Sequence, residues 1–127
     1  MKRKIVKTDK APAAVGPYSQ GVKVGQFVFT AGQIAIDPAV GQIVAQDVAG
    51  QTHQVMHNLQ EVLRQAGSDL DQVIKTTVFL QSMGDFGAMN TVYGSYFGNK
   101  PPARSTVEVA QLPLGALVEI EAIALIS

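Results

Sequence analysis

The sequence predicts an α+β domain in which two helices cover one face of a single mixed β-sheet. Two long segments carry apolar residues at helical spacing, and six shorter ones show the alternation of apolar and polar residues typical of strands. Their order is about three strands, a helix, a strand, a helix and two strands. Right-handed crossovers place both helices on the same face of such a sheet. A chain of 127 residues has the length of one domain.

The first part of the chain is predicted to form a short edge strand and a hairpin. The edge strand lies around residues 5–7. The hairpin joins strand-like runs at residues 22–24 and 27–30 through Gly25 and Gln26. A two-residue loop that begins with glycine is typical of a type II′ turn.

The first helix is predicted over residues 48–66. Asp47 is a suitable N-cap, and Gly67 stands where a left-handed residue commonly follows the end of a helix. The apolar stripe of this helix consists of Val48, Val55, Met56, Leu59, Val62, Leu63 and Ala66.

A strand over residues 73–80 leads to the second helix. Ser82 and Asp85 resemble a capping box at its start, and the helix is predicted to run to about Phe97. Its stripe, rich in aromatic residues, is more typical of a core than of a cofactor site; it comprises Phe86, Met89, Tyr93, Tyr96 and Phe97.

The last two strands, over residues 104–109 and 116–126, carry the charged residues of greatest interest. Glu119 and Glu121 lie on one side of the final strand among apolar neighbours, where a carboxylate needs a partner or a chemical role. Arg104 would reach the same face if both strands belong to one sheet, and a guanidinium can hold a carboxylate through two hydrogen bonds. A structural ion pair, which residue types alone favour, is one interpretation, and a ligand site is the other.

The same side of the sheet is predicted to meet another copy of the chain. Two helices can cover only one face, yet Leu117, Ile123 and Leu125 would lie on the other. Apolar residues on both faces need to be covered, and a second copy of the chain is the commonest partner. We therefore expect a homo-oligomer.

Composition excludes several classes of function. Ten basic residues balance ten acidic ones, so no overall field gathers nucleic acid or an anionic membrane. The absence of cysteine excludes disulfides, thiolate metal sites and cysteine nucleophiles. No apolar run has the length of a secretory signal or a membrane span, so a soluble cytoplasmic protein is expected.

Two histidines and a glutamate raise the question of a metal site. His53, His57 and Glu61 are spaced by four residues on the first helix, a spacing that could chelate a metal. They lie opposite the apolar stripe, on the solvent side, and lack the His-Glu-x-x-His order of zinc hydrolases. We therefore expect no bound metal.

Short motifs spread along the chain form a pattern known from one protein family. The C-terminal segment contains Pro-Ala-Arg-Ser at residues 102–105, Leu-Pro at 112–113 and Val-Glu-Ile-Glu at 118–121. Earlier motifs are Ala-Pro-Ala-Ala-Val-Gly-Pro-Tyr-Ser-Gln-Gly at 11–21, Gly-Gln-Ile at 32–34, Lys-Thr-Thr-Val-Phe at 75–79 and Asn-Thr-Val-Tyr at 90–93. Together they resemble the Rid family, the reactive intermediate deaminases also called YjgF, over essentially the whole chain.

This resemblance implies a chorismate-mutase-like subunit fold, a homotrimer and ligand sites in the clefts between subunits. It also implies an enamine/imine deaminase without a cofactor. Such an enzyme hydrolyses 2-aminoacrylate and the related 2-iminopropanoate or 2-iminobutanoate that pyridoxal-phosphate enzymes release.

The resemblance also gives roles to particular residues. Arg104 would hold the substrate carboxylate, and Glu119 would orient the attacking water and move protons, with Glu121 as its structural partner. Tyr18 would help to position the water or close the pocket, although packing of its ring is the interpretation that sequence alone favours. Asn90 matches a family residue near the site.

The chain departs from the family pattern at two positions. Many active members have serine at the position of Ala31 and cysteine at that of Thr106. Thr106 would supply the same backbone N–H to the substrate, whereas Ala31 lacks a hydroxyl group, and this could weaken or redirect substrate choice.

Two other classes of function compete with the deaminase. A non-enzymatic protein could use the same pocket to bind small carboxylates or to regulate another enzyme. A ribonuclease or translation inhibitor, as some relatives are described, is disfavoured, because the chain has no basic stripe interleaved with stacking aromatics and no evident acid–base pair of histidines.

Overall fold

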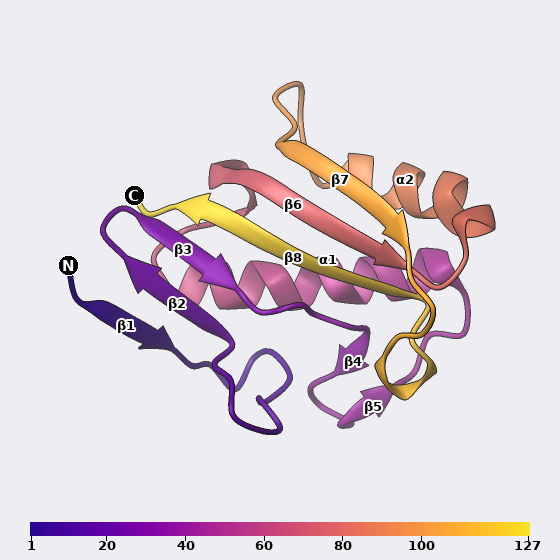
Figure 1. Ribbon diagram of the computed structural model, residues 1–127, viewed down its shortest axis with the longest axis horizontal. Coiled ribbons are helices and arrows are strands. Elements are labelled where there is room, and N and C mark those ends of the chain that lie inside the picture. The colour runs from indigo at the N-terminus through magenta and orange to yellow at the C-terminus, as the bar shows by residue number, and fades with distance from the viewer.

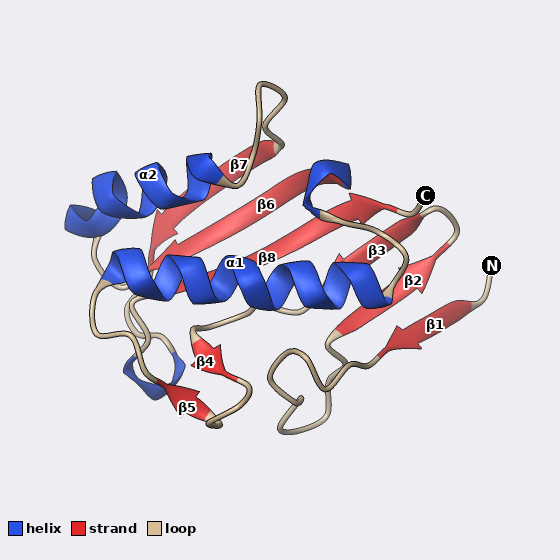
Figure 2. Cartoon of the chain, turned by 180° about the vertical axis from the view of Figure 1, so that it is seen from behind, coloured by secondary structure: helices blue, strands red, loops and turns tan.

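A computed structural model covers residues 1–127 and shows a six-stranded sheet with two helices on one face (Figures 1 and 2). The strands lie in the order β1-β2-β3-β8-β6-β7, and every neighbouring pair is antiparallel except β6 and β7. The predicted fold class and mixed sheet are confirmed. The strands are β1 (Arg3–Val6), β2 (Gly21–Val24), β3 (Phe27–Thr30), β6 (Val73–Leu80), β7 (Ala103–Glu108) and β8 (Val118–Leu125).

The remaining elements pack behind the sheet or at its end. Helix α1 (Val48–Gln65) runs along the middle of the sheet, and the shorter α2 (Phe86–Ser95) lies beside β7 (Figure 2). No helix has both the length and the apolar character needed to cross a membrane. Short 3₁₀ turns are η1 (Leu70–Gln72), η2 (Met83–Asp85) and η3 (Pro113–Gly115), and β4 (Ile36–Asp37) pairs with β5 (Gln42–Ile43) in a separate ribbon.

Both ends of α1 form as the sequence predicts. Asp47 accepts a hydrogen bond through Oδ1 from the N–H of Gly50 at 2.9 Å. After the helix, Gly67 has a φ of +87°, in the left-handed region that glycine adopts most easily. All residues of the predicted apolar stripe are buried. The β2–β3 hairpin likewise turns at Gly25, with a φ of +58°.

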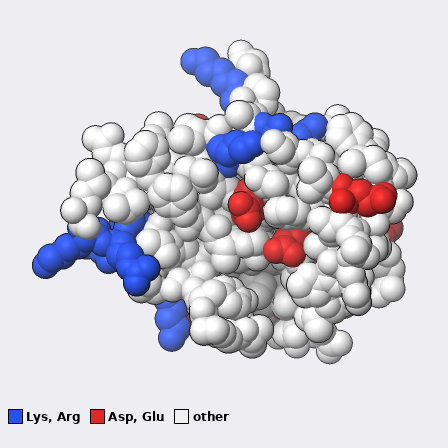
Figure 3. Space-filling model, viewed as in Figure 1, with Lys and Arg blue, Asp and Glu red and all other residues white.

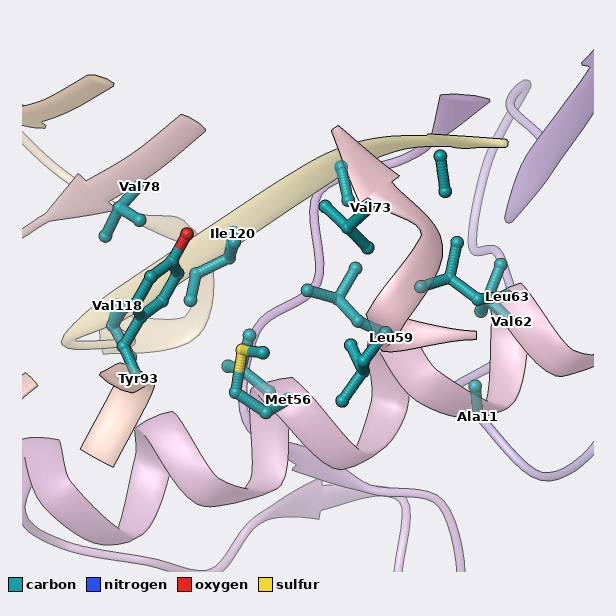
Figure 4. Close-up of a cluster of buried hydrophobic side chains, with 14 of the residues drawn as sticks. Ala11, Met56, Leu59, Val62, Leu63, Val73, Val78, Tyr93, Val118 and Ile120 are labelled. Carbon is teal, nitrogen blue, oxygen red and sulfur yellow. The ribbon is translucent and has the colours of Figure 1, made fainter. Parts of the chain in front are cut away.

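The core lies between α1 and the sheet (Figure 4). Met56, Leu59 and Leu63 of α1 are at most 1% exposed and pack with β8 residues such as Val118 and Ile120. Truncating a leucine or methionine in such a core typically costs about 2–5 kcal/mol. This layer therefore fixes the sheet, and with it the residues of the site, relative to α1.

A bulge changes the alternation expected in β6. The strand has the predicted bounds, but its register shifts between Val73 and Lys75. As a result Val73 is buried whereas Ile74 is 40% exposed. A bulge places an extra residue in one strand, so the simple alternation from residue 73 onward cannot hold.

The start of α2 also differs from the prediction. Ser82 accepts a hydrogen bond from the N–H of Gly84 at 3.2 Å and caps the η2 turn rather than α2. Asp85 makes no side-chain cap, so the expected capping box does not form. The helix ends at Ser95 instead of Phe97.

The strand order separates two charged residues that the sequence analysis placed on one face. β6 lies between β7 and β8, and its register aligns Arg104 with Thr76 and Glu119 with Phe79. Thr76 is 1% exposed on the helix side, whereas Phe79 points the other way. Arg104 and Glu119 therefore project from opposite faces of the sheet. The predicted shared face and the structural ion pair are wrong, and both salt bridges of the structure belong to Arg64.

The face away from the helices exposes apolar side chains. Phe27 and Phe29 of β3 are 40% and 42% exposed, and they align with Leu125 and Ile123 of β8. Most of this face is uncharged, with acidic groups near its middle (Figure 3). The predicted unpartnered face is present, although Leu117 packs against the core instead of lying on it.

Candidate functional site

Arg104 is held in a fixed position at the free edge of the sheet. Its Nη1 donates a hydrogen bond to Oδ1 of Asn90 at 2.8 Å. Its guanidinium carbon lies 5.4 Å from the ring centroid of Phe86 and 4.8 Å from that of Tyr93. Both distances suit cation–π attraction. With no carboxylate within salt-bridge distance, the guanidinium is oriented by neutral groups and keeps its charge available for a ligand.

The ring of Tyr93, which faces Arg104, is itself held in place by a hydrogen bond. The hydroxyl groups of Tyr93 and Thr76 are hydrogen-bonded at 2.7 Å. Burial raises the pKa of Tyr93, although the bond with Thr76 and the charge of Arg104 act in the opposite direction. The phenol therefore stays neutral and presents a ring face suited to a cation.

Thr106 places two polar groups beside Arg104. It is two residues further along β7, on the same face, and its Oγ1 is buried without a hydrogen-bond partner. The N–H of Val109 donates to the carbonyl of Leu80 at 2.9 Å. Because backbone groups alternate in direction along a strand, the N–H of Thr106 points away from β6 toward the free edge. Arg104, Asn90 and Thr106 thus form one group.

Glu119 lies in a second place, half-buried on the uncovered face. Burial, and to a lesser extent the charge of Glu121, raises the pKa of Glu119 above its usual range. The carboxylate lies against Gly32, the residue after Ala31. Ala31 donates its N–H to the carbonyl of Gln20 at 2.9 Å, and its methyl side chain offers no polar contact.

Tyr18 lies in a third place, on the loop before β2. It is half exposed and lines a cavity of about 430 Å³ with residues of β1 and of the loop itself. Its hydroxyl oxygen accepts a hydrogen bond from the N–H of Val15 at 3.4 Å. Neither Arg104 nor Glu119 lines this cavity. A single chain therefore does not bring the three groups into one cavity.

The two histidines lie together on the exposed side of α1, away from the core. His53 and His57 line a hollow of about 420 Å³ with Asp37 and Tyr96, and Nδ1 of His53 is 2.7 Å from the hydroxyl of Tyr96. The structure contains no cluster of three His, Cys, Asp or Glu side chains that could hold a metal ion. Glu61 does not line this hollow, so the structure does not bring the three residues of this sequence spacing together.

Comparison with known proteins identifies the family. The family described as endoribonuclease L-PSP matches residues 8–126. The chain belongs to this family, the YjgF/Rid family. A mouse relative described as 2-iminobutanoate/2-iminopropanoate deaminase is 49% identical to this Rid protein over 122 residues, which are 96% of the chain and 90% of the relative. A RutC family protein of Pyrococcus abyssi is 50% identical over 98% of both chains.

Solved structures of relatives have the same fold. A putative endoribonuclease from Thermotoga maritima is 50% identical to this Rid protein, with a TM-score of 0.95 over 100% of this chain and 99% of that one. Escherichia coli TdcF, solved with bound serine, is 42% identical, with a TM-score of 0.92 over 98% and 99% of the two chains.

Sequence reasoning missed two parts of the Rid protein's candidate site. It assigned Phe86 and Tyr93 to the core alone, yet both also face Arg104. Phe86 lies four residues before Asn90, and Tyr93 lies three residues after it. This spacing places all three on one side of α2, so it could have revealed the surface on which Arg104 rests. The contact between Gly32 and Glu119 leaves no such signal, because it depends on which strands are neighbours.

Proposed function

We propose that this Rid protein hydrolyses 2-iminobutanoate, 2-iminopropanoate and their enamine forms, such as 2-aminoacrylate, to 2-oxo acids and ammonia. Mammalian relatives that are 48–49% identical carry the name of this activity. We assign recognition of the substrate carboxylate to Arg104, Asn90 and Thr106, and the chemistry to Arg104, Glu119 and Tyr18. Ala31, whose methyl group offers no polar contact, would line the substrate-binding site.

The unpaired, pre-oriented guanidinium of Arg104 is the observation that carries this proposal. A guanidinium without a protein carboxylate can bind one from a ligand through two parallel hydrogen bonds. The outward N–H of Thr106 adds a backbone donor at the same edge. TdcF was solved with bound serine, itself an amino acid with a carboxylate. These features support a small 2-imino carboxylic acid as the substrate.

Hydrolysis then exchanges the C=N bond of the substrate for C=O. The oxygen of water adds to the imine carbon while the nitrogen gains a proton. In the resulting carbinolamine, the hydroxyl proton is transferred to the nitrogen as the C=O bond forms and the C–N bond breaks, and ammonia leaves with the 2-oxo acid. Glu119 is proposed to take the proton from water and pass it to the nitrogen, because its raised pKa lies closer to the pH at which a general acid–base catalyst is most effective.

The proposed site requires more than one subunit. Arg104 stands at a free edge, Glu119 lies on the opposite face, and Tyr18 belongs to a separate loop. Docking of a second copy on the uncovered face can bring such groups together across an interface. We propose a homotrimer with a site at each contact between subunits, in line with the resemblance drawn from the sequence.

The test is hydrolysis of freshly generated 2-iminobutanoate by Arg104→Ala. Removing the guanidinium that binds the substrate carboxylate, here called the clamp, should lower kcat/KM by about a hundredfold. This is the cost typical of removing a strong charge-stabilising donor. Lys100→Ala removes an exposed cation outside the site and serves as the control. Unchanged release of ammonia by Arg104→Ala would refute the clamp, provided that both variants elute as the wild-type oligomer.

A binding protein without activity is the competing outcome. Calorimetry with 2-oxobutanoate, run beside the turnover assay, separates the two functions. Binding that depends on Arg104 without any turnover would favour the sensor or regulator over the deaminase.

A further inference from the structure

The side chain of Glu119 occupies space that any residue other than glycine would take at position 32. A Cβ atom built on Gly32 would lie 2.9 Å from Cδ of Glu119 and 3.1 Å from its Cγ, and closer still to Oε2. Carbon atoms in contact are normally 3.5–4.0 Å apart or more. The carboxylate of Glu119 therefore lies in a slot that exists because Gly32 has no side chain.

The backbone conformation of Gly32 does not require glycine. Its φ is outside the left-handed region, in contrast to Gly25, Gly41 and Gly67. A larger residue would therefore be excluded by lack of space and not by backbone strain.

The backbone beside the slot is fixed. Gln33 donates its N–H to the carbonyl of Ile120 at 2.9 Å and accepts from the N–H of Ile120 at 3.1 Å. This bridge ties the segment after Gly32 to β8 at the residue next to Glu119. A methyl group at position 32 would therefore displace the Glu119 side chain more easily than the backbone.

The other neighbours of Glu119 give its carboxylate no polar partner. Phe79 of β6 is its cross-strand partner, on the side opposite Gly32, and Glu121 lies two residues along the same strand face. Lys75, the cation on the same face of β6, aligns with Ile123 and donates to Ser105 at 3.0 Å rather than to Glu119. The carboxylate of Glu119 accepts no hydrogen bond from the protein, so the shape of the slot is the main restraint on its position.

We propose that Gly32 is a positioning residue, which directs the carboxylate of Glu119 by leaving a slot for it beside β8. The inference rests on the proposed function where it concerns catalysis, because Glu119 is there the group that handles the proton. The contact itself can be tested without any turnover.

The first experiment measures the ionisation of Glu119 in Gly32→Ala. The protein is labelled with ¹³C at glutamate side-chain carboxyls, and Glu119→Gln identifies the resonance. Displacement from the slot should change the pKa of Glu119, because burial at this position raises it. Gly94→Ala, at an exposed glycine of α2 with open space around it, is the control and should leave the titration unchanged. An unaltered pKa of Glu119 in folded Gly32→Ala would overturn the proposal.

A stability cycle covers the case in which Gly32→Ala folds poorly. Gly32→Ala should lower Tm in the wild-type background but have little effect in Glu119→Ala, where the slot is empty. An equal loss in both backgrounds would overturn the proposal, because the methyl group would then collide with something other than Glu119.

Activity connects the slot to the reaction. Gly32→Ala should lower kcat for 2-iminobutanoate at least tenfold, and adding it to Glu119→Gln should cause no further loss. If Glu119→Gln hydrolyses the imine at the wild-type rate, the proposed role of Glu119 fails, while the titration still decides whether Gly32 positions the carboxylate.

Discussion

The two charged groups of the candidate site are held in different ways. Arg104 is oriented by one amide oxygen and two aromatic rings, all from α2. Its guanidinium remains partly exposed to solvent, so holding the charge there costs the fold little stability. Glu119 is half-buried near another carboxylate, an arrangement that disfavours its ionised form. The surroundings thus stabilise the charged form of Arg104, whereas they destabilise the ionised form of Glu119.

The raised pKa of Glu119 predicts a pH-dependent cost in stability. A carboxyl whose pKa is higher in the folded than in the unfolded chain contributes stability below the unfolded value, and this is lost as pH rises through the folded value. At pH 7.5 the neutral Glu119→Gln should therefore melt about 1–3 °C above wild type, a small gain because solvent screens a half-exposed group. The difference should shrink toward pH 4.

Calorimetry at the two pH values checks this prediction. Asp71→Asn removes an exposed carboxylate without hydrogen bonds and should show no such pH-dependent gain. A Glu119→Gln variant less stable than wild type at pH 7.5 by the same margin as at pH 4 would contradict the assigned ionisation.

Among the elements, the loop that carries Tyr18 depends on a buried side chain. Gln20 is 3% exposed, donates to the carbonyls of Thr8 and Pro12 at 3.0 and 2.8 Å, and accepts from the N–H of Thr8 at 2.7 Å. These bonds tie the start of the loop to the start of β2. The position of Tyr18 is thus set from the end of the loop rather than by its own single weak bond.

Gln20→Ala should loosen this loop. It leaves partly buried backbone groups of Thr8 and Pro12 without partners, and an unpaired buried group typically costs about 1–3 kcal/mol in the free energy of unfolding. Urea denaturation should show this loss, and limited proteolysis should cut the loop faster. Gln26→Ala, an exposed glutamine in the β2–β3 turn, should change neither, and equal proteolysis of both variants would contradict the role of Gln20.

Local signals in the sequence predict the helices and strands well, but they do not predict which strands lie next to each other in the sheet. Asp47 and Gly67 mark the ends of α1 because capping depends only on adjacent residues. The face to which Arg104 points depends instead on pairing with β6, and a shift of one residue in register reverses every side chain. For the same reason the sequence identified Arg104 and Glu119 but misplaced them relative to each other.

For the whole molecule, the exposed sheet face and the divided site point to the same assembly. Phe27, Phe29 and Val107 are each at least 40% exposed on the face that carries Glu119. Covering this face with another copy would remove apolar surface from water and place Glu119 in an interface. Stability of the assembly and completeness of the site would then depend on the same contact.

Phe29→Asp tests whether assembly and activity depend on the same contact while leaving the subunit fold intact. The aspartate replaces an exposed ring, so each subunit should still fold, but burying the charge in an interface would cost several kcal/mol more than the roughly 1.5–3 kcal/mol contributed by a buried phenylalanine. Equilibrium sedimentation at micromolar concentration should show a monomer, and imine hydrolysis should fall with it although Arg104 and Glu119 are intact. Val40→Asp, at a 54% exposed site beside the β4–β5 ribbon, should keep both the oligomer and the activity. A fully active Phe29→Asp monomer would mean that one chain completes the site, and the requirement for a neighbouring subunit would be wrong.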